Sequence, residues 1–523
     1  MSWWKRALFT IVGLLQRVPV IGPPIRTLVN RIMVNAAVSR CRERPHPWST
    51  AHDYISWTSL SDRSFSARHL PAAAHRELPD ADDVVALFAR PMSAEGGRLS
   101  DGSTLLFPAF AQYLTDGFIR TRMPAEGDDQ SIRLQNTSNH EIDLCTLYGR
   151  TPTQTRALRV LDASPNQRGR LKSQMIGREE FPPFLFDDQG SVDPQFEALD
   201  PPLGVSGIDD ADQRRHILAV GGDRVNAVPQ VAMINTLLLR EHNRLAHDIG
   251  LAHPEWDGDR VFETVRNCMI VMFIKIVVDE YINHISPIPL DFVADPSVAW
   301  NARWNKPKWI TTEFSLLYRW HSLIPDTIRL NGQVRPVHTT FLDNRPLLDG
   351  GLLNSFRDIA GQRAGQLGPR NTTPALLHLE HAAIEQGRLA RLAPYADYKA
   401  YMSKTGRRPQ RFEDVSSDPD VIAVLRAAYR DVGDIEFYVG LFAEDADPNS
   451  PLPKLLGEMV AVDAFSQALT NPLLSKHVMS RRTDAFSTVG WEAVAATSTL
   501  RDVLRRHVAA GTDVDDITMD VRS

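Results

Sequence analysis

Cysteine is scarce in this chain of 523 residues, which has Cys41, Cys145 and Cys268 and no others. Three scattered thiols are too few for a disulfide framework or a thiolate metal site, so we expect a reducing compartment or indifference to redox conditions. Long apolar runs are also missing, and none approaches the roughly 18 residues that indicate a transmembrane helix. The sequence has no HExxH, CxxC or glycine-rich phosphate-loop motif, which leaves zinc proteases and P-loop enzymes without support.

An excess of positive charge is missing too, because 58 Lys and Arg stand against 64 Asp and Glu, for a net charge of −6. This weak acidity argues against nucleic acid as the main partner. Hydrophobic residues make up 43% and charged residues 23% of the chain, a balance that excludes an intrinsically disordered protein. A chain of this length can bury a large core and enclose a cofactor.

Helical periodicity dominates what is present, and runs of alternating polar and apolar residues are lacking. We therefore predict a mainly α fold with few short strands. The periodic stretches are 105–122, 230–250, 259–285, 312–324, 350–364, 376–392, 419–444, 454–470 and 491–509.

Residues 1–45 differ from the rest of the chain, because they contain eight Lys or Arg and a single acid, Glu43. They carry a charge of +7, which leaves −13 for residues 46–523. An apolar stripe at helical spacing runs through them. It consists of Trp4, Leu8, Ile11, Leu15 and Val18.

Basic helices with Trp and Leu on the opposite face lie flat in a bilayer interface. Residues 1–45 are therefore predicted to be monotopic membrane-binding helices, and residues 46–523 the catalytic domain. Two other interpretations stay open: helices docked on the protein's own body, and a secretory signal in which Lys5 and Arg6 precede an apolar stretch. Arg17 follows that stretch closely and no small-residue cleavage site comes next, which argues against the signal.

Two segments carry candidate chemistry. In the first, the spacing of Tyr318 and His321 predicts that both lie on one helix face before Pro325 ends the helix. A neutral imidazole can bind iron, and a nearby phenol can pass an electron to oxidised iron and become a radical; ordinary core packing is the alternative.

In the second, Leu239–Ala246 has charged residues beside a Leu-rich face, which predicts a buried polar network or, alternatively, a solvated face.

The second segment, LREHNRLA, resembles the signature of the animal haem peroxidase superfamily, and YRWHSLIPD at 318–326 resembles its cyclooxygenase and fatty-acid dioxygenase branch. Further matches follow in the family's order over most of residues 50–500, including FAQYLT at 110–115 and NHEIDL at 139–144. The resemblance implies a helical fold around a buried haem and a haem-dependent oxidoreductase.

Roles are implied residue by residue. His321 corresponds to the proximal ligand of the haem iron, and Tyr318 to the radical tyrosine that removes a hydrogen atom from a fatty acid before O2 traps the carbon radical. Gln112 matches the distal glutamine, and Arg224 matches the distal arginine that stabilises a developing peroxide anion. Ser466 aligns near the serine that lines the cyclooxygenase channel.

The distal histidine of the family is replaced here by Asp116. Cleavage of a peroxide O–O bond needs a base that then acts as an acid. A buried carboxylate paired with Arg224 can do this, and His140 is a second candidate; alternatively, peroxidase turnover is weak or Asp116 forms a salt bridge away from the iron. Ala227 and Thr115 stand where the acidic side chains that esterify haem would be, so a non-covalent haem b is predicted. The calcium loop of the family is not recognisable, so the sequence gives no support for calcium.

The substrate clamp departs as well. Cyclooxygenases hold a fatty-acid carboxylate with an arginine and a tyrosine, and Ile288 stands at the position of that tyrosine. Arg40, Arg42 or Arg44 could supply the arginine. A fatty acid or another lipid remains the expected substrate, but prostaglandin-type specificity is unsupported.

Three functions follow from these features. The first is a fatty-acid dioxygenase that uses a Tyr318 radical and O2 to make a hydroperoxide. The second is a haem peroxidase or hydroperoxide-processing enzyme that depends on Asp116 and Arg224. The third is a non-catalytic, membrane-associated haem-binding protein. We expect a cytoplasmic protein held at the membrane periphery by residues 1–45, and the branch is often dimeric, so a homodimer is compatible with the resemblance.

Overall fold

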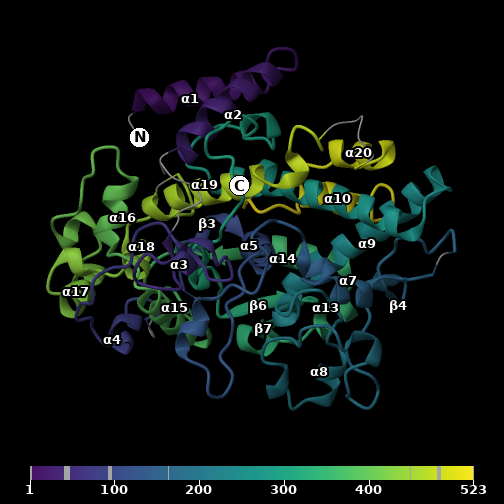
Figure 1. Ribbon diagram of the computed structural model, residues 1–523, viewed down its shortest axis with the longest axis horizontal. Coiled ribbons are helices and arrows are strands. Elements are labelled where there is room, and N and C mark those ends of the chain that lie inside the picture. The colour runs from purple at the N-terminus through teal and green to yellow at the C-terminus, as the bar shows by residue number, and fades with distance from the viewer. Residues whose placement is uncertain are drawn as a thin grey trace.

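The computed structural model describes residues 3–39, 48–91, 97–162, 164–447, 449–479 and 485–521. Helices make up most of its regular structure (Figure 1), as predicted. The α-helices of the first half are α1 (Trp3–Gln16), α2 (Gly22–Val38), α3 (Trp57–Ser61), α4 (Ala81–Val85), α5 (Leu106–Asp116), α6 (Cys145–Tyr148), α7 (Pro152–Leu158), α8 (Ala211–Arg215), α9 (Pro229–Ala252) and α10 (Gly258–Ile276). Those of the second half are α11 (Asn283–Ile285), α12 (Thr312–Leu317), α13 (Arg345–Gly350), α14 (Leu352–Ala360), α15 (Leu377–Leu389), α16 (Tyr395–Met402), α17 (Pro419–Ala428), α18 (Phe437–Ala443), α19 (Lys454–Leu469), α20 (Thr488–Ala495) and α21 (Leu500–Arg505).

The strands are short and form antiparallel pairs. The pairs are β1 (Trp48–Ser49) with β2 (Ala67–Arg68), β3 (Leu99–Thr104) with β8 (Arg363–Gly365), β4 (Gln174–Ile176) with β5 (Glu179–Phe181), and β6 (Thr327–Leu330) with β7 (Gln333–Pro336). No sheet in the described part of the chain has more than two strands, which agrees with the predicted mainly α class.

Helices α9 and α10 pack on each other at the centre of the body, and α5 packs on α9 (Figure 1). Helix α9 begins at Pro229, where the missing backbone N–H costs no helical hydrogen bond. Helix α10 is capped by Asp257, whose carboxylate accepts a hydrogen bond from the backbone N–H of Arg260 at 2.8 Å. Almost all of α9 is buried, so its polar side chains need partners inside the protein.

The polar residues of α9 find those partners, as predicted. Glu241 is fully buried and accepts hydrogen bonds from Arg244 at 2.7 and 3.0 Å, and it lies 2.8 Å from His507 and 3.0 Å from Arg506. Burial alone would raise the pKa of Glu241, but its hydrogen bonds with His507 and Arg244 and the charges of Arg506 and Arg244 outweigh burial and lower that pKa to about 2. His242 makes hydrogen bonds through both ring nitrogens, from Nδ1 to the Tyr148 hydroxyl at 2.9 Å and from Nε2 to the carbonyl of Gly169 at 2.8 Å, so the segment ties several elements to α9.

Several predicted helices are shorter than their periodicity indicates or are divided: 105–122 is helical only as α5, and 491–509 is split into α20 and α21. The stretch 312–324 is helical only as α12, and a separate 3₁₀ turn covers His321–Leu323. Tyr318 adopts φ −103° and ψ 20° at the end of α12, so the prediction that Tyr318 and His321 share one helix face is wrong. The stretch 419–444 is likewise split into α17 and α18, because Gly433 lies in an intervening 3₁₀ turn that Asp431 caps.

The N-terminal hairpin of α1 and α2 packs on α19 at the outside of the body (Figure 1). Its inner face is docked: Gly13 approaches Pro289 so closely that an added Cβ would lie 2.4 Å from the carbonyl oxygen, and Asn30 donates to the carbonyl of Val293 at 2.9 Å. Its outer face is apolar and exposed. The exposed residues are Trp3, Trp4, Leu8, Ile11, Leu14, Leu15, Val18, Val20, Ile21, Leu28 and Ile32.

The predicted stripe of residues 4–18 therefore points away from the body rather than toward it. The inner face of the hairpin is docked on the protein, and its outer face is exposed. Within the described residues, no helix combines the length and the apolar character that crossing a bilayer requires.

Candidate active site

His321 faces a buried carboxylate from a helix distant in sequence. Its Nδ1 atom lies 3.1 Å from Oε1 of Glu380 on α15. Glu380 in turn accepts hydrogen bonds from the Thr372 hydroxyl at 2.7 Å and from the Tyr438 hydroxyl on α18 at 2.5 Å. Sequence reasoning missed Glu380, because nothing in the local pattern of α15 indicates which of its polar residues points inward.

A second group of predicted residues involves α5, which contains Gln112 and Asp116. The carboxylate of Asp116 lies 3.7 Å from Nη1 of Arg224, so the expected ion pair is present. Burial raises the pKa of Asp116 to about 6, against the opposing effect of Arg224. An acid with this pKa changes charge close to neutral pH, as a group that both accepts and returns a proton must.

Arg319 connects the two groups electrostatically. Burial and the charge of Arg224 lower its pKa, whereas Tyr438, Asp116 and Glu380 act to raise it. One guanidinium thus lies within electrostatic range of the Asp116–Arg224 pair and of the Glu380–Tyr438 pair. Its Nε atom makes no hydrogen bond within the described ranges.

Tyr318 lies in a cluster of aromatic rings. Its ring centroid is 5.0 Å from that of Trp320 and 5.1 Å from that of Phe314. Burial raises the pKa of its phenol well above the ordinary value, so the group stays protonated at neutral pH. The hydroxyl of Tyr281 influences this pKa too, although neither phenol makes a regular hydrogen bond in the part of the chain that the structure describes.

The residues of both groups fit a haem. The His321 side chain keeps 13% of its surface accessible, and its Nε2 atom makes no hydrogen bond among the described residues. The Asp116 Oδ2 atom is buried and lacks a hydrogen-bond partner in the same set. An imidazole nitrogen without a hydrogen-bond partner would bind the iron of a haem, and a buried acid with an uncommitted oxygen would handle protons in its chemistry.

Ser466 lies in a buried ionic cluster that the sequence did not reveal. Its hydroxyl accepts a hydrogen bond from Nζ of Lys308 at 2.7 Å. Lys308 also lies 3.4 Å from a carboxylate oxygen of Asp463, whose other oxygen is 3.1 Å from Nε2 of His69. Asp463 contributes to the raised pKa of Tyr318, so this cluster lies within electrostatic range of the phenol.

Other predicted residues lie apart from this site or outside the described ranges. His140 bonds through both ring nitrogens to backbone groups, of Arg63 at 2.8 Å and of Ile310 at 3.2 Å, so it is not available as a distal base. Ile288 is next to Pro289, which α1 contacts, and is therefore near the N-terminal hairpin. Arg40, with Arg42 and Arg44, lies outside the described residues.

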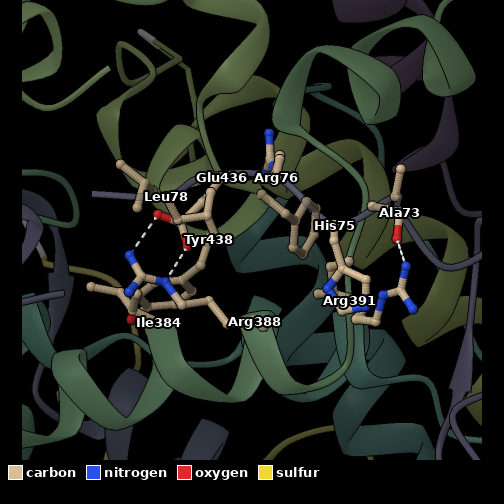
Figure 2. A pocket seen from close by; sticks show the side chains of 14 residues that line it. Ala73, His75, Arg76, Leu78, Ile384, Arg388, Arg391, Glu436 and Tyr438 are labelled. Carbon is tan, nitrogen blue, oxygen red and sulfur yellow. Dashed lines mark hydrogen bonds and ion pairs between the residues drawn. The ribbon is translucent and has the colours of Figure 1, made fainter. Parts of the chain in front are cut away.

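A pocket open to solvent is lined in part by residues of α15 and α18 (Figure 2). Tyr438 and Ile384 contribute to its wall, and Arg388 binds Glu436 there through hydrogen bonds of 2.7 and 3.0 Å. Since the Tyr438 hydroxyl reaches Glu380, a single side chain separates this pocket from the carboxylate that faces His321.

Comparison with known proteins gives relatives of two kinds. Prostaglandin G/H synthase 2 of Bos taurus is 29% identical over 469 residues, which cover 86% of this chain and 72% of the relative. Prostaglandin G/H synthase 2 of Equus caballus is 30% identical with the same coverage. The solved structure of Oryza sativa fatty acid alpha-dioxygenase is similar in fold, with a TM-score of 0.67 at 17% identity over 99% of this chain and 95% of that one.

The structure of peroxidase A from Dictyostelium discoideum is similar as well, with a TM-score of 0.66 at 20% identity over 87% of this chain and 94% of that one. Residues 108–516 match the family model of animal haem peroxidase. This range contains Gln112, Asp116, Arg224, Tyr318 and His321. The chain therefore belongs to the animal haem peroxidase family and is a haem-dependent oxidoreductase.

Proposed function

We propose that this protein oxygenates a fatty acid with O2 by means of a radical on Tyr318. The observation that carries the proposal is the place of Tyr318, a buried phenol three residues before His321 and enclosed by aromatic rings. A plain peroxidase has no need of such a group. The alpha-dioxygenase fold and the prostaglandin synthase relatives support an oxygenase.

A bound haem supplies the one-electron oxidising power for the reaction. The Tyr318 phenol loses one electron and one proton and becomes a neutral radical. This radical takes a hydrogen atom from a carbon of the acyl chain, and the carbon radical that results combines with O2. The peroxyl radical then takes a hydrogen atom back from Tyr318, so the sum is one fatty acid plus one O2 to one hydroperoxide.

The high pKa of Tyr318 suits this role, because the group that donates and receives a hydrogen atom must be the protonated phenol. Among the described residues its hydroxyl makes no regular hydrogen bond, although the Tyr281 hydroxyl influences it, so its oxygen is not committed to a strong partner. The aromatic rings of Phe314 and Trp320 exclude water, which would compete for the radical.

Oxygen uptake by the haem-loaded protein with C12–C20 fatty acids tests this proposal. Tyr318→Phe is expected to abolish uptake and to leave the visible haem spectrum unchanged. Tyr395→Phe is the matched control, because the hydroxyl of Tyr395, like that of Tyr318, is buried and lacks a hydrogen bond among the described residues. Uptake that persists in Tyr318→Phe would overturn the radical mechanism.

A second candidate function is a haem peroxidase or hydroperoxide-processing activity. Asp116 favours it, since a carboxyl with a pKa of about 6 can take a proton from a peroxide and return it to the leaving oxygen. Arg224, 3.7 Å away, would stabilise the negative charge that develops on the peroxide. Peroxide-dependent oxidation of a phenol that survives Tyr318→Phe but not Asp116→Asn would identify this activity. For either function, Ala227 and Thr115 favour a non-covalent haem b.

We also propose that the α1–α2 hairpin lies on a membrane surface, with a cytoplasmic location. Its outer face combines exposed Trp and Leu with the exposed cations Lys5 and Arg6, the composition of an interfacial helix. Sedimentation with phosphatidylcholine vesicles containing an anionic lipid tests this. Trp3→Ala is expected to weaken binding, and Trp57→Ala is the control, because the two side chains are 83% and 81% exposed and Trp57 lies outside the hairpin. Equal vesicle binding by both variants, or a dimer that Trp3→Ala dissociates, would contradict the proposal.

A further inference from the structure

We infer that Glu380 is a positioning residue for the iron ligand: it holds Nδ1 of His321 and makes the imidazole a stronger electron donor. The inference rests on haem ligation by His321, which is part of the proposed function, but on neither the fatty acid nor the Tyr318 radical. Its basis is a chain of three contacts. Tyr438 and Thr372 hold the carboxylate, and the carboxylate faces the ring.

The placement of Glu380 is specific. Its side chain is 2% exposed, so it has no access to bulk water and must be satisfied by the protein. Its Oε2 atom takes the Tyr438 hydroxyl at 2.5 Å, and its Oε1 atom takes the Thr372 hydroxyl at 2.7 Å. The remaining acceptor capacity of Oε1 is directed at Nδ1 of His321, 3.1 Å away.

The Nδ1 atom has no other partner. It is buried, and within the described residues no group makes a regular hydrogen bond to it, so Glu380 is the polar group that it faces. Hydrogen-bond distances in a site often shorten when its ligand binds. With Nδ1 protonated and directed at the carboxylate, Nε2 carries the lone pair that binds iron, which fixes the tautomer.

The carboxylate of Glu380 should lower the midpoint potential of a bound haem iron. A carboxylate that accepts the Nδ1 proton shifts negative charge into the ring and raises the basicity of Nε2. A more basic ligand stabilises ferric iron more than ferrous iron, so the midpoint potential of the Fe(III)/Fe(II) couple falls. The two hydroxyls oppose this effect, because each draws charge from the carboxylate and so weakens its hold on the Nδ1 proton.

A purely structural role for Glu380 predicts something different. In that case Glu380 would only join α15 to α18 through Tyr438, and every variant that breaks the joint would disturb the haem in the same direction. The electronic role predicts shifts of the midpoint potential in opposite directions. Glu380→Gln removes the negative charge of the carboxylate, whereas Thr372→Val and Tyr438→Phe remove a hydrogen bond to it and so leave more of its charge to interact with Nδ1 of His321.

The experiment is redox titration of the haem-loaded protein, followed by its visible spectrum. Glu380→Gln keeps the size of the side chain and is expected to raise the midpoint potential. A change in an outer partner of a metal ligand typically alters metal affinity about 10- to 100-fold. A tenfold loss of preference for ferric over ferrous iron corresponds to about 59 mV for a one-electron couple. Thr372→Val and Tyr438→Phe are expected to lower the potential.

Glu385→Gln is the matched control, because it makes the same change of charge on α15 at a side chain that is 46% exposed and bonded to Arg388. Its midpoint potential is expected to equal that of the wild type. Resonance Raman spectra of the ferrous proteins give a second measurement, and the iron–histidine stretch is expected to fall in frequency in Glu380→Gln.

The outcomes are distinct. An iron–histidine band in the wild type that Glu380→Gln leaves unshifted, together with an unchanged potential, overturns the inference. Shifts of the same sign in Glu380→Gln and Thr372→Val also overturn it, in favour of a structural role. Absence of the iron–histidine band from the wild type contradicts haem ligation by His321 itself, and so the proposed function rather than the role of Glu380. If Glu380→Gln fails to bind haem, Thr372→Val still decides the sign.

Discussion

The acid–base state of Asp116 gives a sharp prediction about the reaction with peroxide. Its pKa is raised to about 6 by burial. The carboxylate can serve as a base only when it is ionised, so the rate should fall as the pH falls through 6. With a pKa of about 6, the ionised fraction rises about tenfold between pH 5 and pH 7, and the rate should rise by about the same factor.

Stopped-flow mixing of the haem-loaded protein with a hydroperoxide measures this rate directly from the change of the visible haem spectrum. Asp116→Asn keeps the shape of the side chain but removes the base. It is expected to slow the reaction by roughly 10²- to 10⁴-fold, the usual contribution of a general base, and to flatten the profile between pH 5 and 7.

Glu280 is the control for this assignment. It is a partly buried acid whose pKa is raised by desolvation to about 7, but its carboxylate accepts a hydrogen bond from the backbone of Leu500 rather than pairing with Arg224. Glu280→Gln should therefore leave the profile in place. A wild-type rate that does not change between pH 5 and 7, or an Asp116→Asn variant with the wild-type rate, would refute the role of Asp116.

Three further predictions concern stability and docking. Glu241→Ala removes the buried carboxylate that pairs with Arg244 and Arg506 and should cost about 3–5 kcal/mol, seen as a lower urea midpoint. Gly13→Ala places a Cβ 2.4 Å from the carbonyl oxygen of Pro289 and should loosen the N-terminal hairpin, which faster tryptic cleavage within residues 3–39 would reveal. Gly440→Ala places a Cβ 2.2 Å from the ring of Tyr395 and should lower stability by about 1–3 kcal/mol, measured by thermal unfolding. Unchanged values in these assays would contradict the packing described here.

Some of this architecture could be predicted from the sequence, because it follows from local patterns. Charged residues on the Leu-rich face of α9 had to find partners once the helix was central, and Glu241 did so. The apolar stripe of residues 4–18 follows from the helical spacing of its residues, and the structure places it on the exposed face of the hairpin. Asp116 and Arg224 could be paired only through the family resemblance, since 108 positions separate them in the sequence.

What could not be predicted depends on contacts between distant segments. The helical period continues past residue 317, but the chain leaves the helix there, so Tyr318 and His321 face different partners. Glu380 and Lys308 gain their significance only from the side chains that the fold brings against them, His321 in one case and Ser466 in the other. The helical period of a segment predicts which of its faces is buried, but it does not predict which residues of other segments pack against that face.

The docking of the N-terminal hairpin has a kinetic consequence. Helix α2 packs on α19, the helix that also carries Asp463, whose charge acts on Tyr318. If the outer face of the hairpin rests on a bilayer, the protein meets its substrate in two dimensions, and the amount of fatty acid per unit of membrane area sets the rate. Adding inert lipid at a constant amount of fatty acid would then slow turnover by surface dilution, whereas diluting protein and vesicles together into more buffer would hardly change turnover per enzyme.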